Sequence, residues 1–233
     1  MKKIKFYSEE NIPLELHRAR IVQILDLIPI EGRMKAITEA GNNTFLLYNK
    51  DIFLDMLTDS GVNAMSDTMQ AAMMQADDSY AGSATYTRMQ KKLEELFEMK
   101  FFLPAHQGRA CEHILIERFV KPNDVVPMNV RFDSIKDFIK NAKATYIEMI
   151  FENALETCNE NQFKGNFDIK KLKTTIVQYG ADRIPFVRIE AGANLIGGQP
   201  VSLDNIIAIS TICRKHGILL VLDASLLQDN LHF

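Results

Sequence analysis

One short segment of the sequence carries residue types that suit a phosphate group. Residues 104–109 read Pro-Ala-His-Gln-Gly-Arg and lie between a predicted strand and a predicted helix. Free backbone N–H groups at a helix start would hold a phosphate, with Gly108 permitting close approach and Arg109 adding a charged donor. Short glycine-containing loops are equally common as plain connections, so the segment by itself leaves both interpretations open.

Two polar residues follow other predicted strands. Asp223 ends an apolar run, where a carboxylate would point into a cleft and accept a hydrogen bond from a protonated ring nitrogen. Taken alone, the pattern favours an Asx-turn or a cap. Asn194 precedes Gly197 and Gly198, and these glycines favour a tight turn as the first interpretation. The amide of Asn194 could also bind a ligand oxygen.

Tyr80 lies in a polar loop, residues 77–83, between two predicted helices. A tyrosine there would donate a proton if its pKa is lowered or its site is dry. More often such a ring packs while its hydroxyl stays hydrated. Thr58 and Gly61 belong to a similar polar segment, for which capping and turn formation are the default. The methionines within residues 65–74 indicate adaptable helix packing and no metal site.

The elements that must position these residues alternate between strand and helix. A helical arm is expected over the first forty residues, and Ser66 has the pattern of an N-cap. The alternation that follows predicts an α/β domain with a mostly parallel sheet, whose ligands bind beyond the carboxyl ends of the strands. The last strand is continuously apolar, as expected for a strand covered on both faces. The expected strands are residues 101–103, 125–130, 145–150, 186–189 and 218–222, and the expected helices lie near residues 69–76, 89–97, 110–119, 169–179 and 203–213.

Composition restricts the classes of partner. The 233 residues are 47% hydrophobic and 24% charged, close to the average of soluble globular proteins. A net charge of -3 gives no support to nucleic acid or an anionic membrane as a partner, and no apolar run is long enough to cross a bilayer. Three cysteines without metal-ligand spacing (Cys111, Cys158 and Cys213) fit reduced thiols, so we expect a cytoplasmic protein.

Six motifs follow one another along the chain: residues 57–61, 78–83, 106–109, 164–168, 197–202 and 223–224. Taken in order, this series resembles the tryptophanase and tyrosine phenol-lyase family. The resemblance runs from about residue 33 to residue 233 and covers the first half of the family's subunit. It implies an α/β, aminotransferase-like pyridoxal-phosphate enzyme of fold type I, with a helical N-terminal arm and small-domain portion over residues 1–50. Residues 51–233 would form an incomplete cofactor-binding large αβα domain with a mostly parallel sheet.

The resemblance also implies roles for individual residues. Tyr80 would be the general acid that protonates the leaving aromatic ring, in a site built across two subunits of a homotetramer. Thr58 would help place the substrate carboxylate, and Asp133 would also contact the substrate. A monovalent cation, potassium, would be bound by the carbonyl of Gly61 and by Asp78, which stands where the family usually has glutamate. Pyridoxal 5'-phosphate would be held by Gln107, Gly108 and Arg109 at its phosphate, Phe132 stacked on its ring, Asn194 at its phenolic oxygen and Asp223 at its ring nitrogen.

The implied reaction is β-elimination of an aromatic amino acid to pyruvate and ammonia. Asp133 after Phe132, and residues 69–74, are closer to the tryptophanase pattern, which would expel indole from tryptophan. Residues 43–47 and 63–67 are closer to tyrosine phenol-lyase. We favour tryptophan as the substrate, with tyrosine as the alternative.

Three departures from the family pattern motivate a further alternative, a catalytically inactive homologue. The lysine that holds the cofactor in the family falls beyond Phe233 in the resemblance, so the chain by itself is expected to be inactive. The family has an arginine three residues after its aspartate, whereas this chain has Leu226. Residues 133–138, Asp-Ser-Ile-Lys-Asp-Phe, are unlike the family's polar segment.

Overall fold

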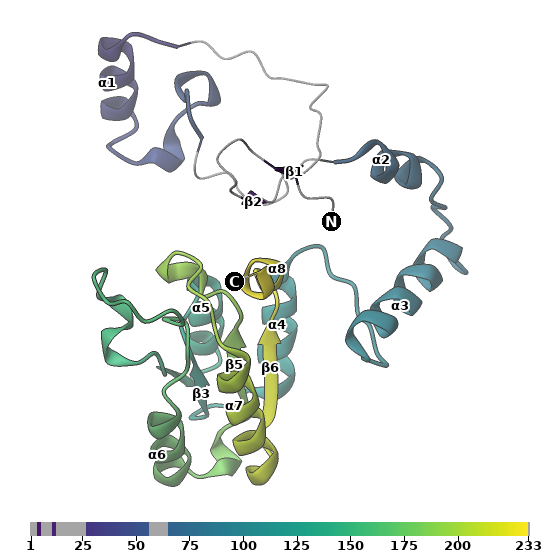
Figure 1. The fold of residues 1–233 in the computed structure, drawn as a ribbon, viewed down its shortest axis with the longest axis vertical. Coiled ribbons are helices and arrows are strands. Elements are labelled where there is room, and N and C mark those ends of the chain that lie inside the picture. Colours follow the sequence, from purple (N-terminus) through teal and green to yellow (C-terminus); the bar gives the residue numbers. More distant parts are fainter. Residues whose placement is uncertain (1–3, 6–10, 13–26, 56–64, 233) are drawn as a thin grey trace. The chain divides into compact units, whose positions relative to one another are not determined.

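The computed structural model describes residues 4–5, 11–12, 27–55 and 65–232, which form two compact units (Figure 1). The first unit is Met1–Lys91 and the second is Lys92–Phe233. Within the described ranges, no helix is long and apolar enough to cross a membrane.

The first unit is built from short elements. Its strands β1 (Ile4–Lys5) and β2 (Asn11–Ile12) pair antiparallel, so the prediction of a helical arm is wrong for these residues, where β-branched isoleucines favour a strand. The arm is helical at α1 (Ile30–Glu39). The other elements are the 3-10 helices η1 (Thr44–Leu46) and η2 (Asn49–Asp51), the helix α2 (Asp67–Met74), and α3 (Ala84–Phe97), which extends past Lys91.

Ser66 caps α2 as predicted, because its Oγ accepts a hydrogen bond from the backbone N–H of Met69 at 3.0 Å. The methionines of this helix do not pack as expected. Met69, Met73 and Met74 are 57%, 60% and 82% exposed, so no core covers them among the described residues.

The second unit contains a parallel four-stranded sheet in the order β4-β3-β5-β6 (Figure 1). The alternation of strand and helix predicted from the sequence is therefore confirmed. The strands are β3 (Val125–Met128), β4 (Thr145–Glu148), β5 (Phe186–Glu190) and β6 (Leu219–Asp223). The helices are α4 (Gly108–Phe119), α5 (Asp133–Asn141), α6 (Ile169–Tyr179), α7 (Leu203–His216) and α8 (Leu227–His232), with 3-10 turns η3 (Glu152–Leu155), η4 (Ala181–Arg183) and η5 (Asn194–Ile196).

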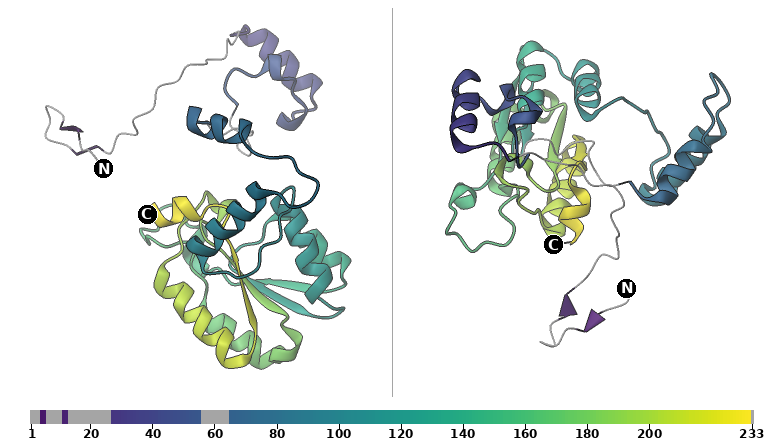
Figure 2. Two further views of the ribbon diagram at one scale, coloured as in Figure 1. Left: turned by 90° about the vertical axis from the view of Figure 1, so that its right-hand side faces the viewer. Right: turned by 90° about the horizontal axis from the view of Figure 1, so that it is seen from above.

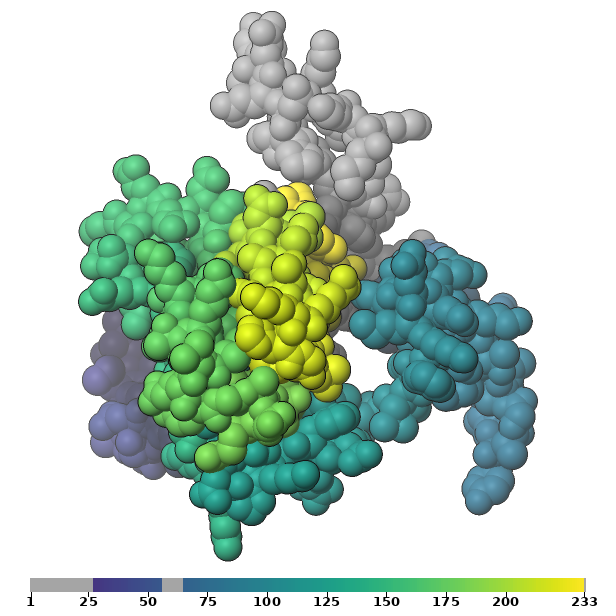
Figure 3. Space-filling model, turned by 90° about the horizontal axis from the view of Figure 1, so that it is seen from below, coloured from purple at the N-terminus to yellow at the C-terminus, as the bar shows by residue number. Residues whose placement is uncertain are grey.

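Helices cover both faces of the sheet, giving three layers (Figure 2). Apolar residues of α6 and α7 pack with Val187 and Ile189 on one face. Apolar residues of α4 and α5 pack with Phe186 on the other face. Figure 3 shows α6 and α7 side by side on the outer surface. Because successive strand residues point to opposite faces, Arg188 of β5 shares the α4 side with Phe186.

The helix ends of this unit follow local sequence rules. The carboxylate of Asp168 accepts hydrogen bonds from the N–H groups of Lys170 and Lys171 and so caps α6. Ser202 caps α7 through the N–H of Asn205. Gly217 ends α7 with a φ of 66°, a left-handed conformation that glycine adopts at little cost.

Two sequence predictions about strands are wrong. Residues 101–103 form no strand, and Phe101 and Leu103 are 86% and 69% exposed; an apolar run this short does not specify strand pairing. The strand β6 is not covered on both faces, since Leu219 and Leu222 are 44% and 41% exposed. Within the described residues β6 pairs with β5 alone, so it is an edge strand.

Gly165 lies where two chain segments meet without space for a side chain. A Cβ there would lie 2.4 Å from the carbonyl oxygen of Gln199 and 2.9 Å from that of Pro200. We expect Gly165→Ala to lower the free energy of unfolding by about 1–3 kcal/mol, because backbone atoms must move. Urea unfolding measures this, with Gly108→Ala as the control, since a Cβ on Gly108 would have no atom of the described part of the chain within 4 Å. Equal losses in the two variants would contradict the prediction.

Candidate active site

The strand order places a candidate site between β3 and β5. From β3 the chain adds β4 on one side, and later adds β5 and β6 on the other, so the order reverses between β3 and β5. Ligands of parallel sheets bind outside the carboxyl ends of the strands at such a reversal. Asn129 follows β3 there and is fully buried; its Nδ2 donates to the carbonyl oxygens of Glu190 and Gly165 at 3.0 and 3.1 Å. The N–H of Glu190 donates to Oδ1 of Asn129, which joins the two strand ends.

A buried arginine is at the centre of this edge of the sheet. The side chain of Arg188 is 2% exposed, and its Nη2 lies 2.5 Å from Oδ2 of Asp223 on β6. Its Nη1 lies 3.5 Å from Oε2 of Glu190 and donates to the carbonyl oxygen of Val130 at 3.3 Å. Nη2 is also 3.8 Å from Oε1 of Glu112 on α4. One guanidinium therefore contacts carboxylates from three elements.

The two carboxyls nearest Arg188 on the strands have opposite pKa shifts. Burial disfavours the charged form of Asp223, but the charge of Arg188 and hydrogen bonds from Ser225 outweigh it, so the pKa of Asp223 is lowered. Burial raises the pKa of Glu190 despite the same arginine, and the charge of Asp223 adds to that rise. Asp223 is thus the more readily ionised of the two carboxyl groups, and its side chain is 21% exposed.

Asp223 ends β6 as predicted, and its interpretation as the start of an Asx-turn is confirmed. Its Oδ1 accepts hydrogen bonds from the backbone N–H and Oγ of Ser225, at 3.0 and 2.5 Å, which is the turn favoured by the local pattern. Its Oδ2 faces Arg188. A carboxylate oxygen has more than one lone-pair direction, so a further donor can still be accepted.

The predicted phosphate segment leads into a helix as expected. Helix α4 begins at Gly108 after Gln107, whose backbone is extended, and Gln107, Gly108 and Arg109 are exposed. Among the residues that the structure describes, no atom lies within 4 Å of a Cβ built on Gly108, so its surroundings there are open. Glu112, one turn later, reaches Arg188 and accepts a 2.5 Å hydrogen bond from Ser134. The first turns of α4 and the end of β6 therefore lie on the same side of the sheet (Figure 1).

Phe132 and Asp133 follow β3 at the start of α5. Phe132 is half-buried and packs against the core shared by α4 and α5. The side chain of Asp133 is 73% exposed and lies 3.4 Å from Nζ of Lys136. The sequence analysis did not identify α5, although buried Ile135 and Ile139 have helical spacing.

Asn194 starts a turn, as the glycines after it predicted. Gly197 and Gly198 have φ values of 83° and 71°, and Asn194 itself is exposed. The N–H of Asn194 donates to Oε1 of Glu190 at 3.3 Å, which connects this turn to the Arg188 cluster. Leu226 packs closely against Gly192, since a Cβ built on Gly192 would lie 2.8 Å from the Cβ of Leu226. The leucine side chain brings no charge to Asp223.

The first unit carries the remaining predicted residues. The loop that presents Tyr80 is closed by Asp77, which accepts hydrogen bonds from Ser83 and from the backbone N–H groups of Ala84 and Thr85. Hydrogen bonds from Thr85 and Ser83 hold the pKa of Asp77 well below its usual range. Tyr80 is fully exposed, and Asp78 is also exposed. Thr58 and Gly61 lie outside the described residues.

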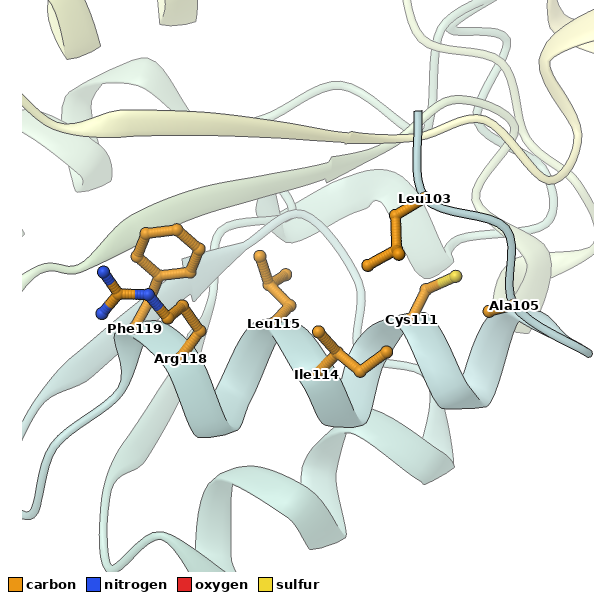
Figure 4. Close-up of a pocket in the computed structure, with 7 residues that line it drawn as sticks. All are labelled: Leu103, Ala105, Cys111, Ile114, Leu115, Arg118 and Phe119. Atoms are coloured by element: carbon orange, nitrogen blue, oxygen red, sulfur yellow. The ribbon is translucent and has the colours of Figure 1, made fainter. Parts of the chain in front are cut away.

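An open hollow of about 230 Å³ runs along α4 (Figure 4), and the residues that line it are not among the predicted ligand residues. It is lined by Leu103, Ala105, Cys111, Ile114, Leu115, Arg118 and Phe119. These side chains are mostly apolar, so the hollow lacks the charged groups found around Asp223.

Four buried or half-buried polar residues at this edge of the sheet were not predicted from the sequence, namely Asn129, Arg188, Glu190 and Glu112. One signal was available. Arg188 and Glu190 are charged residues two positions apart in a short strand, which places both on one face of an otherwise apolar element. Charged side chains are rarely buried without a partner, so the pair indicated a polar site at the end of β5.

Comparison with known proteins assigns the class. The family described as "Beta-eliminating lyase" matches residues 55–232, and the chain belongs to this family. Curated relatives carry the name tyrosine phenol-lyase. That of Symbiobacterium sp. (strain SC-1) is 36% identical over 219 residues, covering 94% of this chain and 48% of the relative. That of Pasteurella multocida (strain Pm70) is 37% identical over 223 residues, covering 96% and 49%. The chain spans about half the length of the curated relatives it matches.

Solved structures show a weaker likeness. Cystalysin from Treponema denticola, which contains a pyridoxal 5'-phosphate cofactor, has a TM-score of 0.48 and 15% identity, covering 66% of this chain and 38% of that one. N-Succinyldiaminopimelate aminotransferase from Mycobacterium tuberculosis has a TM-score of 0.49 and 16% identity, covering 66% and 39%. The family assignment comes from the sequence matches, which favour the phenol-lyase alternative over the tryptophanase preferred from the motifs.

Proposed function

We propose that the protein takes part in pyridoxal-phosphate-dependent β-elimination of tyrosine, releasing phenol, pyruvate and ammonia. The observation that carries the proposal is the match of nearly the whole chain to relatives named tyrosine phenol-lyase. The donor set at the sheet edge supports it: an ionised, partly exposed Asp223 would pair with a ring nitrogen, and the open start of α4 would take a phosphate. When bound, the cofactor takes up electrons from the substrate carbon that has lost its proton.

The residues of this chain would bind and orient the cofactor and move one proton. Asp223 would keep the ring nitrogen protonated, and Asn194 would bind the ring's phenolic oxygen. Phe132, already held against the core, would stack on the ring. Gln107, Gly108 and Arg109 would bind the phosphate.

The substrate and cation contacts come from the family resemblance alone. Tyr80 would donate the proton that lets the aromatic ring leave as phenol, in a site shared between subunits of a homo-oligomer. Thr58 and Asp133 would contact the substrate, and Gly61 and Asp78 would bind potassium.

The decisive experiment measures products. Because the chain by itself is expected to be inactive, it is tested together with the half of the subunit that carries the cofactor lysine in the family. This protein is incubated with pyridoxal phosphate, potassium and either L-tyrosine or L-tryptophan, and phenol, indole and pyruvate are quantified. We expect phenol with pyruvate from tyrosine. Indole from tryptophan as the main product would favour the tryptophanase alternative, which Asp133 motivates. If neither phenol nor indole forms, the proposed elimination is contradicted and an inactive homologue is favoured.

A further inference from the structure

Arg188 contacts one of the proposed cofactor ligands directly and is linked to two others through carboxylates. Arg188 lies 2.5 Å from Asp223, the proposed partner of the ring nitrogen. It lies 3.5 Å from Glu190, whose other carboxylate oxygen accepts the N–H of Asn194, the proposed partner of the ring's phenolic oxygen. It lies 3.8 Å from Glu112, one turn into the helix that begins at the proposed phosphate segment.

The burial of Arg188 indicates that these contacts are built into the fold. The guanidinium is 2% exposed, and its partners on β5 and α4, Glu190 and Glu112, have side chains 3% and 14% exposed. A planar guanidinium with five N–H donors holds several acceptors in defined directions, which a lysine ammonium would not do. Leu226 is uncharged, so Arg188 is the cation that contacts Asp223 within the described part of the chain.

The charges of this cluster are not balanced within the described residues. One guanidinium faces three carboxyl groups, from β5 (Glu190), β6 (Asp223) and α4 (Glu112). Burial raises the pKa of Glu190, so this carboxyl holds a proton more readily than an exposed one. The pKa of Asp223 is lowered, which favours its ionised form, and a protonated ring nitrogen would complement this charge.

We propose that Arg188 is a positioning residue that holds Asp223 toward the cofactor's ring nitrogen and ties it, through Glu190 and Glu112, to the segments that bind the ring oxygen and the phosphate. This inference rests on the proposed cofactor site. It assigns the positive charge beside Asp223 to Arg188 of β5. The family pattern would instead have placed an arginine at position 226, where this chain has leucine.

The test uses pyridoxamine 5'-phosphate as the probe, because it has the ring nitrogen and the phosphate but no aldehyde to react with lysines. Affinity is measured by calorimetry for the full chain, for Arg188→Met and for Arg183→Met. Arg183 is a matched control, since it precedes β5 at the opposite end and donates to the carbonyl oxygen of Asn123. We expect Arg188→Met to bind about tenfold more weakly, the loss for one weakened charge-assisted hydrogen bond, and Arg183→Met to bind normally.

A second measurement does not depend on the cofactor. Carboxyl ¹³C titration of Asp223 is expected to show a higher pKa in Arg188→Met than in the unaltered chain or in Arg183→Met, because the neighbouring positive charge is lost. If Arg188→Met does not fold, Arg188→Lys is the test variant. Lysine keeps the charge but not the fork of donors, so we expect a smaller loss of affinity than methionine would give.

The outcomes separate the two proposals. Unchanged affinity and unchanged Asp223 titration in the Arg188 variants would overturn the role of Arg188. Failure of the unaltered chain to bind the probe would contradict the proposed cofactor site, and the titration of Asp223 would then decide whether Arg188 controls this carboxylate.

Discussion

Replacing Asp223 with asparagine is expected to reduce β-elimination by about 10²–10³-fold, the effect of removing one preorganised charge contact to the reacting group. An amide cannot keep the ring nitrogen protonated, so the bound cofactor would accept electrons poorly. Rates are measured in the active protein with tyrosine and with an S-aryl cysteine, whose thiolate leaves without help from an acid. Both substrates should lose rate equally, because the ring nitrogen is needed for either leaving group.

The matched control is Asp204→Asn, which makes the same change at an exposed residue in the first turn of α7. Its elimination rate should stay within about twofold of normal, since surface changes have small effects. In Asp223→Asn the buried Arg188 keeps Glu190 and Glu112 as partners, so the fold should persist. An Asp223→Asn protein that is folded and fully active would contradict the proposed contact with the ring nitrogen.

Tyr80→Phe is expected to lower phenol release from tyrosine by about 10²–10⁴-fold, the range for loss of a general acid. The aromatic ring must gain a proton to leave as phenol, and phenylalanine has none to donate. The S-aryl cysteine should react at nearly the normal rate, because its leaving group needs no proton. The roles of Tyr80 and Asp223 are thereby distinguished: the Tyr80 variant still reacts with the S-aryl cysteine, whereas the Asp223 variant is slow with both substrates.

Tyr48→Phe is the control for this variant, since Tyr48 is also an exposed tyrosine of the first unit. It should release phenol at the normal rate. If Tyr80→Phe slows both substrates alike, the hydroxyl acts on something other than the leaving group. If it slows neither, Tyr80 is not the acid.

The sequence by itself was sufficient for features that depend on neighbouring residues. Helical spacing and capping predicted α4, α6 and α7, and Ser66 was identified as an N-cap that the structure confirms. The end of an apolar run placed Asp223 at the end of β6. The alternation of elements predicted a parallel sheet. Such features are local because hydrogen bonds within a helix and side-chain alternation within a strand join residues close in sequence.

Only the tertiary structure decided which charges meet. Arg188 and Asp223 are 35 positions apart, and Glu112 belongs to a helix that precedes every strand of the sheet. Their contact depends on β5 and β6 being neighbours and on α4 packing over the same face, which no local pattern specifies. Within the described residues, the strand order also places β6 at the edge of the sheet, which explains why a continuously apolar strand is partly exposed. Burial makes Arg188 of β5 the centre of the candidate site, because a charged group removed from water is stable only when it is paired with other polar groups.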